Sequence, residues 1–264
     1  MHPISRRFAT LRERGEGALV VFVTAGDPGL GELCSILECL QEAGADLLEV
    51  GVPFSDPIAD GPTIQASSQR ALDRGVTPQA VLETLSRVRL AVPVVLMGYY
   101  NTVLRRGLDV FAGSAANAGV SGTIISDLTP EESGEWVAAS EAAGLANVFL
   151  AAPTSTDARL DTVCAHSTGF VYAVSRTGVT GVGNGVPQEV GEMVARIRAR
   201  TETPVCVGFG ISEPEQVRRV CASADGAVVG SWLVELLAAR WEGGRGAGAV
   251  SEAVAALKAA TRRF

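Results

Sequence analysis

The sequence has very few of the side chains on which much enzyme chemistry depends. Only one of its 22 basic residues is a lysine, Lys258, and we expect it in the last helical stretch, beyond every loop that forms a site. This placement argues against Schiff-base chemistry. The two histidines, His2 and His166, are too few for a histidine-rich metal site and leave little room for a Ser-His-Asp triad. We expect His166 near a helix end, facing solvent or the helix dipole. Catalysis must therefore depend mainly on carboxylates.

Long hydrophobic runs and basic patches are also missing. The longest apolar stretches, such as residues 91–97, fall well short of the roughly 20 residues that a membrane span needs. A net charge of −7 argues against binding to nucleic acid or anionic lipid. Residues 1–16 contain no apolar segment of the secretory type, so we expect a cytoplasmic protein. The five cysteines lack metal-type spacing, and we expect them to be reduced core thiols.

Short apolar runs alternate with longer amphipathic segments along the whole chain of 264 residues. The amphipathic segments often end before a glycine, as Glu32–Ala43, Pro62–Arg74 and Glu131–Ala143 do. Because the apolar runs are nearly continuous, the pattern favours a closed parallel (β/α)8 TIM barrel, one domain over residues 1–264, rather than an open doubly wound sheet. The eight expected strands are Ala18–Val23, Asp46–Val50, Val92–Met97, Gly122–Ile125, Asn147–Leu150, Phe170–Val174, Pro204–Val207 and Gly226–Val229.

Two carboxylates follow the second expected strand, where a barrel places its chemistry. Strand alternation puts Glu49 on the same face as Leu47, inside the barrel, where desolvation raises a carboxyl pKa and suits it to acid–base work. The alternative is a buried structural carboxylate held by an arginine. Asp60, just before Gly61 and Pro62, is equally consistent with catalysis and with a helix N-cap. Asp56 is expected in a turn or at a contact.

Glycines in the later loops indicate a phosphate site. Residues 208–212 and 230–231 follow the last two expected strands, where backbone N–H groups and a helix N-terminus bind anions in many barrels. Gly178 and Gly181 belong to a glycine-rich segment, residues 175–187, that is long enough to form a mobile lid. These residues predict a small phosphate ester as substrate. Since the protein offers neither lysine nor metal as an electron sink, the reaction is an isomerisation or the substrate supplies its own sink.

Several motifs make the chain resemble the alpha subunit of tryptophan synthase over essentially its full length. They are FVTAGDP at 22–28, LEVGVPFSDPIADGPTIQ at 48–65, MGYYN at 97–101, SRTGVTG at 175–181 and GFGIS at 208–212. The resemblance implies a (β/α)8 barrel that reversibly cleaves indole-3-glycerol phosphate to indole and glyceraldehyde 3-phosphate. Protonation of the indole at C3 would make the substrate its own electron sink.

The resemblance also implies roles for particular residues. Glu49 would protonate C3 and remove the side-chain hydroxyl proton, Asp60 would hold the indole N–H, and Tyr172 would be the active-site tyrosine. Thr180 would meet the aspartate when the lid closes. The residues implied at the indole pocket are Phe22, Tyr99, Asp127 and Phe209, and those implied at the phosphate are Gly181, Gly208, Gly210, Gly230 and Ser231.

A partner is implied as well, because alpha subunits of this family bind a beta subunit in an α2β2 heterotetramer and pass indole to it through a tunnel. Asp56 would lie near that contact, and pyridoxal phosphate would be held only by the beta subunit. This chain itself would need no cofactor and no metal. It departs from the family pattern at Thr129, at Trp232 and in the glycine-rich residues 182–185.

Three other functions remain open from the sequence. The chain could be a stand-alone indole-3-glycerol phosphate lyase that releases free indole, with the same catalytic residues. It could be a catalytically weak regulatory or binding subunit, or an isomerase built on another barrel.

Overall fold

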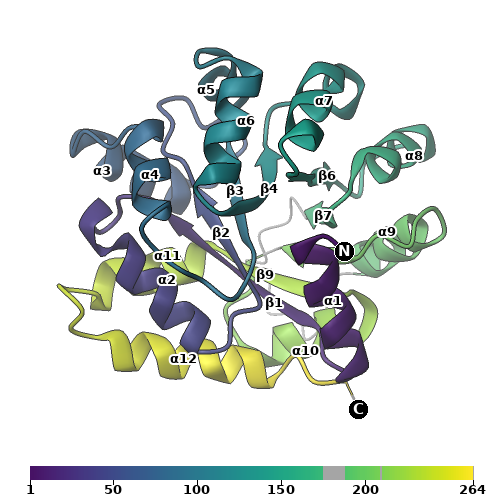
Figure 1. The fold of residues 1–264 in the computed structure, drawn as a ribbon. Helices are drawn as coiled ribbons and strands as arrows, with labels where there is room; N and C mark the ends of the chain where they lie inside the picture. The colour runs from purple at the N-terminus through teal and green to yellow at the C-terminus, as the bar shows by residue number, and fades with distance from the viewer. Residues whose placement is uncertain (175–187, 209, 264) are drawn as a thin grey trace.

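The computed structural model, which describes residues 1–174, 188–208 and 210–263, contains a parallel sheet that curves into a barrel (Figure 1). Its strands follow the order β5-β4-β3-β2-β1-β9-β8-β7-β6. All of the pairings are parallel. The strands are β1 (Ala18–Thr24), β2 (Leu47–Gly51), β3 (Val94–Gly98), β4 (Val120–Ile125), β5 (Ala146–Asn147), β6 (Phe149–Ala151), β7 (Val171–Val174), β8 (Val205–Gly208) and β9 (Gly226–Val229).

The two ends of this sheet, β5 and β6, are separated only by Val148, so the barrel is nearly closed. The expectation of one uninterrupted fifth strand over residues 147–150 is wrong in this detail. The Asn147 carbonyl accepts from both Thr168 N–H (2.9 Å) and Gly169 N–H (3.1 Å), which breaks the regular ladder at this point. The third strand begins two residues later than expected, after Pro93, which has no N–H to donate.

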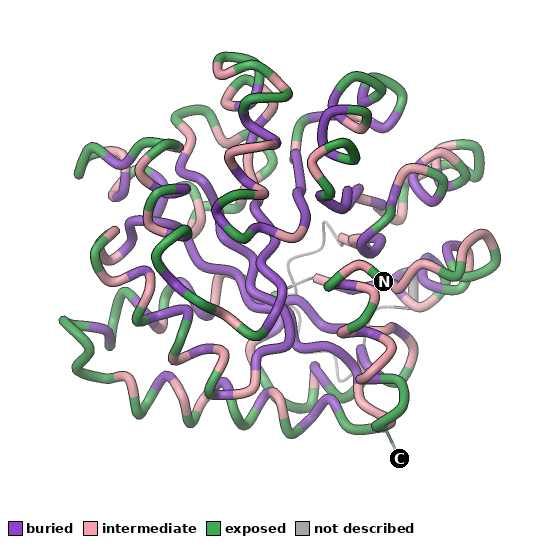
Figure 2. The backbone as a smooth tube through the Cα atoms, viewed as in Figure 1, coloured by how far each residue is buried: buried purple, intermediate pink, exposed green. Residues whose placement is uncertain are grey.

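Helices pack around the outside of the barrel, with their buried faces toward the strands (Figure 2). Between the strands and these helices lies the larger apolar cluster of the described residues. The helices are α1 (Pro3–Glu13), α2 (Leu33–Glu42), α3 (Pro62–Asp73), α4 (Pro78–Leu85), α5 (Tyr100–Leu104), α6 (Leu108–Asn117), α7 (Gly134–Ala142), α8 (Asp157–His166), α9 (Gln188–Arg198), α10 (Pro214–Ser223), α11 (Ser231–Arg240) and α12 (Ala247–Ala259), with 3-10 turns η1 (Leu30–Glu32) and η2 (Pro130–Glu132).

Helix α1 covers the end of the barrel at which the strands begin. Its apolar residues Ile4, Phe8 and Leu11 join the side chains that fill the barrel interior. The Phe8 and Phe170 ring centroids are 6.2 Å apart. Because α1 blocks this end, access to the barrel interior is left at the opposite end, where the strands finish.

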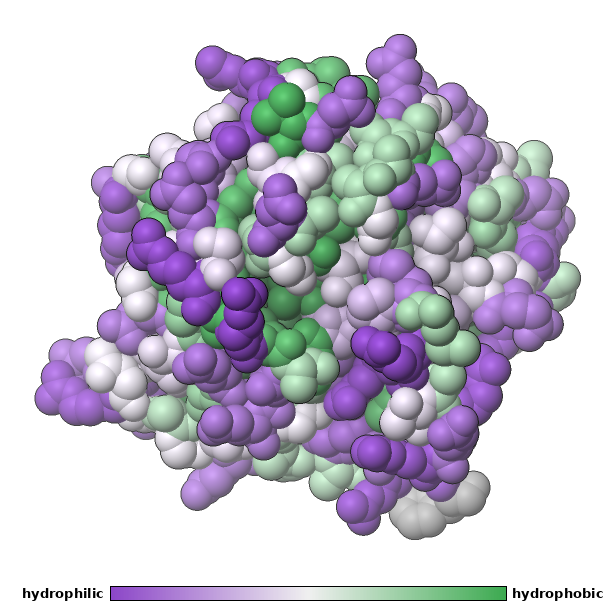
Figure 3. All heavy atoms as spheres, viewed as in Figure 1, coloured by the Kyte–Doolittle hydropathy of each residue, from purple (hydrophilic) through white to green (hydrophobic). Residues whose placement is uncertain are grey.

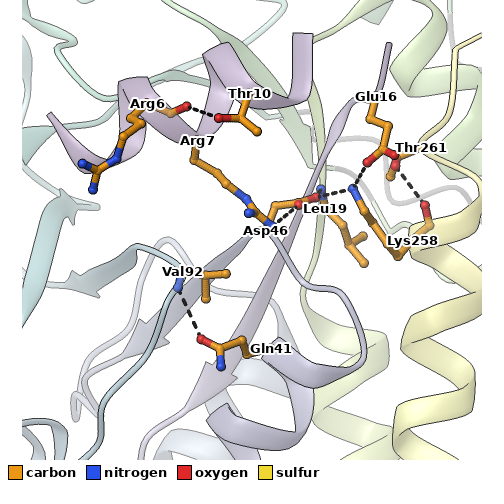
Figure 4. A network of polar contacts seen from close by, with 10 residues as sticks. All are labelled: Arg6, Arg7, Thr10, Glu16, Leu19, Gln41, Asp46, Val92, Lys258 and Thr261. Atoms are coloured by element: carbon orange, nitrogen blue, oxygen red, sulfur yellow. Dashed lines mark hydrogen bonds and ion pairs between the residues drawn. The ribbon is translucent and has the colours of Figure 1, made fainter. Parts of the chain in front are cut away.

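An ionic network fixes the same blocked end (Figure 4). Asp46 is fully buried and accepts from Arg7 (2.7 Å), from the Leu19 N–H (2.7 Å) and from Lys258 Nζ (2.9 Å). Lys258 also contacts Glu16 at 2.8 Å. The only lysine therefore joins α12 to the start of the barrel, away from the strand ends at which we expected chemistry.

His166 and the five cysteines all lie within the described residues. His166 ends α8, and its Nδ1 lies 2.9 Å from the Thr162 carbonyl. Cys164, Cys206 and Cys221 are buried, whereas Cys34 and Cys39 are half-buried, and none forms a disulfide. No described helix is long and apolar enough to cross a membrane. On the face in Figure 3, hydrophilic side chains project outward and hydrophobic ones show between them.

Candidate active site

Glu49 lies inside the barrel, near the end of β2. The sheet register places it between Phe22 of β1 and Val95 of β3, and only 1% of its surface is exposed. Its Oε2 atom has no hydrogen-bond partner, and no described arginine forms an ion pair with it, so it is not an arginine-held structural carboxylate. Burial, followed by the negative charge of Asp60, raises the pKa of Glu49 to about 8. The side chain therefore keeps its proton near neutral pH.

Asp60 lies in the loop between β2 and α3 and is half-buried. Burial raises its pKa to about 6, although a hydrogen bond with the Tyr99 hydroxyl favours the charged form. The N-cap of α3 is Gly61, so the alternative role of Asp60 as that cap is wrong. Tyr99 also accepts from the Ala59 N–H at 3.1 Å and stacks on Phe54, with ring centroids 4.7 Å apart.

Tyr172 of β7 is partly buried and packs against the apolar cluster that fills the barrel interior. Burial raises its pKa well above the ordinary value, and the negative charge of Glu49 adds to the effect, so the hydroxyl stays protonated. Its ring lies over Gly208 of β8. A Cβ atom added at Gly208 would come within 2.8 Å of the Tyr172 hydroxyl oxygen. Gly208 thus leaves the space that Tyr172 occupies.

Phe22 and Asp127 were both expected at the substrate pocket, and they have different surroundings. Phe22 is buried beside Glu49, and its ring covers the Cα of Gly51, where a Cβ would lie 2.5 Å from it. Asp127 is exposed, and its Oδ1 accepts from the Tyr100 N–H at 2.7 Å, at the start of α5. This bond fixes the backbone next to Tyr99.

The structure brings the two expected phosphate loops together, since β8 and β9 are neighbours. Gly208 ends β8, and Gly210 has a φ of 49°, which favours glycine. Gly230 is the N-cap of α11 and Ser231 is its first residue, so free backbone N–H groups begin there. Thr180, Gly181, Phe209 and the expected lid, including residues 178 and 182–185, lie outside the described residues.

The two departures from the family pattern that the structure describes do not touch the carboxylates. Trp232 packs partly buried against the apolar cluster outside the barrel. The Thr129 hydroxyl donates to Glu132 at 3.1 Å. Asp56 is exposed, accepts from the Ser55 hydroxyl, and its carbonyl accepts from the Ile58 N–H at 2.9 Å, as a turn former does.

The sequence did not indicate how the loop bearing Asp60 is attached. Gln65 Nε2 donates to the Asp60 carbonyl at 2.8 Å, and the hydroxyls of Thr24 and Ser67 lie 2.6 Å apart. Gln65 belongs to the long motif over residues 48–65, and this motif was the one feature of the sequence that pointed to a role for the glutamine. Within the described residues, no group of three or more His, Cys, Asp or Glu side chains is arranged to hold a metal.

The geometry therefore gives two nearby carboxyl groups with different pKa values. At pH 7, Glu49 is mainly protonated and Asp60 is mainly ionised. Such a separation provides one proton donor and one anion in the same site. Aromatic rings and glycine-lined loops complete its surroundings.

Sequence comparisons show which known proteins the whole chain is similar to. The family model described as Tryptophan synthase alpha chain matches residues 8–262. The chain is 52% identical over 237 residues to the tryptophan synthase alpha chain of Citrifermentans bemidjiense, covering 89% of each chain. It is 51% identical over 238 residues to that of Geobacter sulfurreducens, covering 89% of this chain and 90% of the relative.

Solved structures give the same result. A tryptophan synthase structure from Mycobacterium tuberculosis matches with a TM-score of 0.92 and 37% identity, covering 100% of this chain and 99% of the other. The alpha subunit of tryptophan synthase from Legionella pneumophila matches with a TM-score of 0.90 and 32% identity, covering 99% and 98%. The fold is thus that of a TIM barrel of this kind.

Proposed function

The chain belongs to the tryptophan synthase alpha chain family, and on that basis we propose that it cleaves indole-3-glycerol phosphate into indole and glyceraldehyde 3-phosphate. This is a lyase reaction of tryptophan biosynthesis. The observation that carries the proposal is the buried Glu49, held without an ionic partner beside Asp60 inside the open end of the barrel.

Glu49 acts as the general acid and base. Its raised pKa keeps a proton available for C3 of the indole, and protonation there makes the ring nitrogen an acceptor for the electrons released on cleavage. The resulting carboxylate then removes the proton from the side-chain hydroxyl next to the breaking bond. An aldehyde forms and the ring regains its aromaticity, so the substrate does what a lysine imine does in other aldolases.

Asp60 binds the indole N–H as a carboxylate and stabilises the positive charge that develops on the ring. Tyr172 and Phe22 line the pocket next to Glu49, and Tyr99 orients Asp60. The phosphate binds at the N–H groups of Gly208, Gly210, Gly230 and Ser231, together with Gly181. Thr180, Phe209 and Asp127 complete the pocket as substrate-binding residues.

The same family membership supports a partner. We infer that the chain joins a beta subunit in a cytoplasmic α2β2 heterotetramer and delivers indole to it, with Asp56 at the contact. Pyridoxal phosphate belongs to that partner, and this chain uses no cofactor or metal of its own. Exposed Asp56 lies two residues from Ile58, which is 83% exposed, and this supports a contact surface there.

An indole-release assay on the purified chain tests the proposal, with indole-3-glycerol phosphate as substrate. Glu49→Gln should lower kcat by about 100-fold to 10,000-fold, the range typical of a lost general acid or base. Asp60→Asn should lose somewhat less, because it still offers an acceptor to the indole N–H. Circular dichroism should show that both variants fold. Indole release by Glu49→Gln at the unmodified rate would contradict the assignment.

A further inference from the structure

Helix α3 is bound to the end of β1 by a buried hydroxyl pair. Thr24, the last residue of β1, and Ser67, on α3, have oxygens 2.6 Å apart, and they are 3% and 0% exposed. The Ser67 hydroxyl donates to the Ile64 carbonyl at 2.8 Å. Thr24 is therefore the donor to Ser67. Neither hydroxyl is free to turn to another acceptor without breaking a buried bond.

One helical turn further along α3, a bidentate ion pair joins the helix to the loop that directly follows β1. Arg70 Nε and Nη2 donate to the two oxygens of Asp27 at 3.0 and 2.6 Å. Asp27 is only 7% exposed, and Arg74 adds a weaker contact at 3.4 Å. Paired, nearly parallel hydrogen bonds of this kind fix orientation as well as distance. Helix α3 therefore cannot rotate relative to the β1 end while the pair holds.

The loop with Asp60 is in turn bound to the first turn of α3. Gln65 Nε2 donates to the Asp60 carbonyl at 2.8 Å and lies 3.5 Å from the Pro57 carbonyl. Both acceptors are backbone atoms, so Gln65 sets where the loop runs. Glu49, on the other side, is fixed by the ladder that pairs Phe22 with Glu49 and Thr24 with Gly51. The two carboxylates are thus connected through β1 and α3.

We propose that Gln65, Ser67 and Arg70 are positioning residues, which hold Asp60 at a fixed place relative to Glu49 by attaching its loop to α3 and α3 to β1. The catalytic part of this inference rests on the proposed function of Asp60. None of the three touches a reacting atom, and their effect on turnover passes through Asp60.

The position of Asp60 can be measured without turnover, because its titration depends on where it lies. The ionisable groups that face it are Glu49 of β2, Tyr99 after β3 and Tyr172 of β7. Burial holds its pKa at about 6. If α3 loosens, Asp60 moves toward water and away from Glu49, and its pKa falls toward the ordinary aspartate value.

The test titrates the Asp60 carboxyl carbon by NMR in the unmodified chain and in Arg70→Gln, with Asp60→Asn to assign the signal. Arg159→Gln serves as the control, because it removes a partly exposed ion pair with Glu131 far from the loop. In Arg70→Gln the Asp60 pKa should fall by about one pH unit, as expected for partial loss of desolvation. Arg70→Lys, which keeps the charge, should lie in between, and the control should not change. An unaltered Asp60 pKa in Arg70→Gln overturns the proposal.

Turnover gives the second measurement. Arg70→Gln should lower kcat by about tenfold to 100-fold with little change in KM, since small misplacements of a catalytic group have effects of this size. In the Asp60→Asn background, Arg70→Gln should lower kcat by a much smaller factor. Full additivity overturns the proposal. If the unmodified chain releases no indole, the proposed function fails while the titration still decides whether α3 positions Asp60.

Discussion

At the scale of single residues, the site depends on how differently two carboxyl groups are solvated. Glu49 is almost completely buried and has no hydrogen-bond partner at Oε2. Asp60 is only half-buried and is hydrogen-bonded by Tyr99. The same mechanism, desolvation, raises both pKa values, but it acts more strongly on Glu49. The order of their ionisation therefore follows mainly from burial, and the charge of Asp60 acting on Glu49 and the Tyr99 hydrogen bond to Asp60 widen the separation.

This order predicts a bell-shaped dependence of turnover on pH. Asp60 must be ionised to bind the indole N–H, so activity should fall as the pH drops below about 6. Glu49 must hold its proton, so activity should also fall as the pH rises above about 8. Both limbs should be visible in kcat/KM measured between pH 5 and about 9.5. Asp60→Asn should remove the acid limb and keep the alkaline one, and an acid limb that survives in this variant would assign it to another group.

The burial of Glu49 also predicts a pH-dependent cost in stability. Its pKa in the folded state, about 8, lies above the ordinary glutamate value of 4.5, so the folded state binds more protons than the unfolded state between these two pH values. The stability contributed by protonated Glu49 is therefore complete below about pH 4.5 and is lost as the pH rises through about 8.

Glu49→Gln does not titrate, so its Tm relative to the unmodified chain should rise between pH 5 and about 8. Thermal unfolding followed by circular dichroism at several pH values measures this difference. The control is Glu131→Gln, which changes an exposed carboxylate outside the barrel. Gln65→Glu would be unsuitable, because it alters the loop that carries Asp60. A pH-independent difference for Glu49→Gln would show that Glu49 is ionised in the fold.

How much of the site could be predicted differs from residue to residue. The inward direction of Glu49 followed from strand alternation, because a period of two assigns each residue to one face. The role of Asp60 was ambiguous, because an aspartate before Gly-Pro is as consistent with a helix N-cap as with a catalytic residue. The structure resolves this ambiguity, because Gly61 is the cap and Asp60 lies in a loop that Gln65 of α3 and Tyr99 after β3 hold in place. The contact with Tyr99 joins segments far apart in the sequence, so no local pattern predicts it.

At the scale of elements, the barrel was largely predictable and its irregularities were not. Glycines after α2, α3 and α7 have positive φ angles, so the helix ends that they marked are physical stop signals. The division of the fifth strand at Val148 depends instead on which carbonyl accepts from residues 168 and 169. These hydrogen bonds join segments about 20 residues apart, so the sequence around Val148 contains no pattern that predicts the division.

The contact between elements with the clearest energetic prediction is the one between α12 and Asp46, the residue just before β2. Lys258→Met should destabilise the chain by about 3 kcal/mol, because it leaves buried Asp46 with a single cationic partner. Chemical denaturation at pH 7 measures the loss. Arg245→Met, which removes an ion pair that is 79% exposed at both side chains, should have little effect.

At acid pH, the difference in the free energy of unfolding between Lys258→Met and the unmodified chain should become smaller. Lys258 lowers the pKa of Glu16 by hydrogen bonding, so the stability that this pair contributes is present above the ordinary glutamate value of 4.5 and is lost as the pH falls through the lower pKa of the folded state. Equal stability of the two chains at pH 7 would contradict a structural role for Lys258.

At the scale of the whole molecule, the barrel has one closed and one open end. Helix α1 and the Asp46 network close the end where the strands begin. Glu49, Asp60 and the phosphate loops lie at the other end. A cavity of about 460 Å³ that contains none of these residues is lined by the β2–α3 loop and by residues at the starts of α4 and α5, including Phe54, Thr77 and Asn101. Among the described residues, the most exposed large hydrophobic side chain after Met1 is Ile58 of the same loop.

The surface proposed for a beta subunit lies on the loop that carries Asp60, and this proposal predicts which substitution separates binding of the partner from indole release. Ile58→Asp should weaken association with a beta subunit by about tenfold to 100-fold, as loss of a well-buried interface side chain commonly does. Indole release by the isolated chain should change little, because the Ile58 side chain is 83% exposed in the free chain. Ala91→Asp adds the same charge at the closed end and should leave association unchanged.

Analytical ultracentrifugation of each variant with a beta subunit, together with indole release with and without that partner, makes both measurements. In the unmodified chain we expect an α2β2 complex, and faster turnover within it if the bound partner restricts the loop that carries Asp60. High turnover by the isolated chain with no complex would instead favour a stand-alone lyase. Undiminished association of Ile58→Asp would place the contact on another surface, and the turnover of that complex would then show whether the Asp60 loop still responds to the partner.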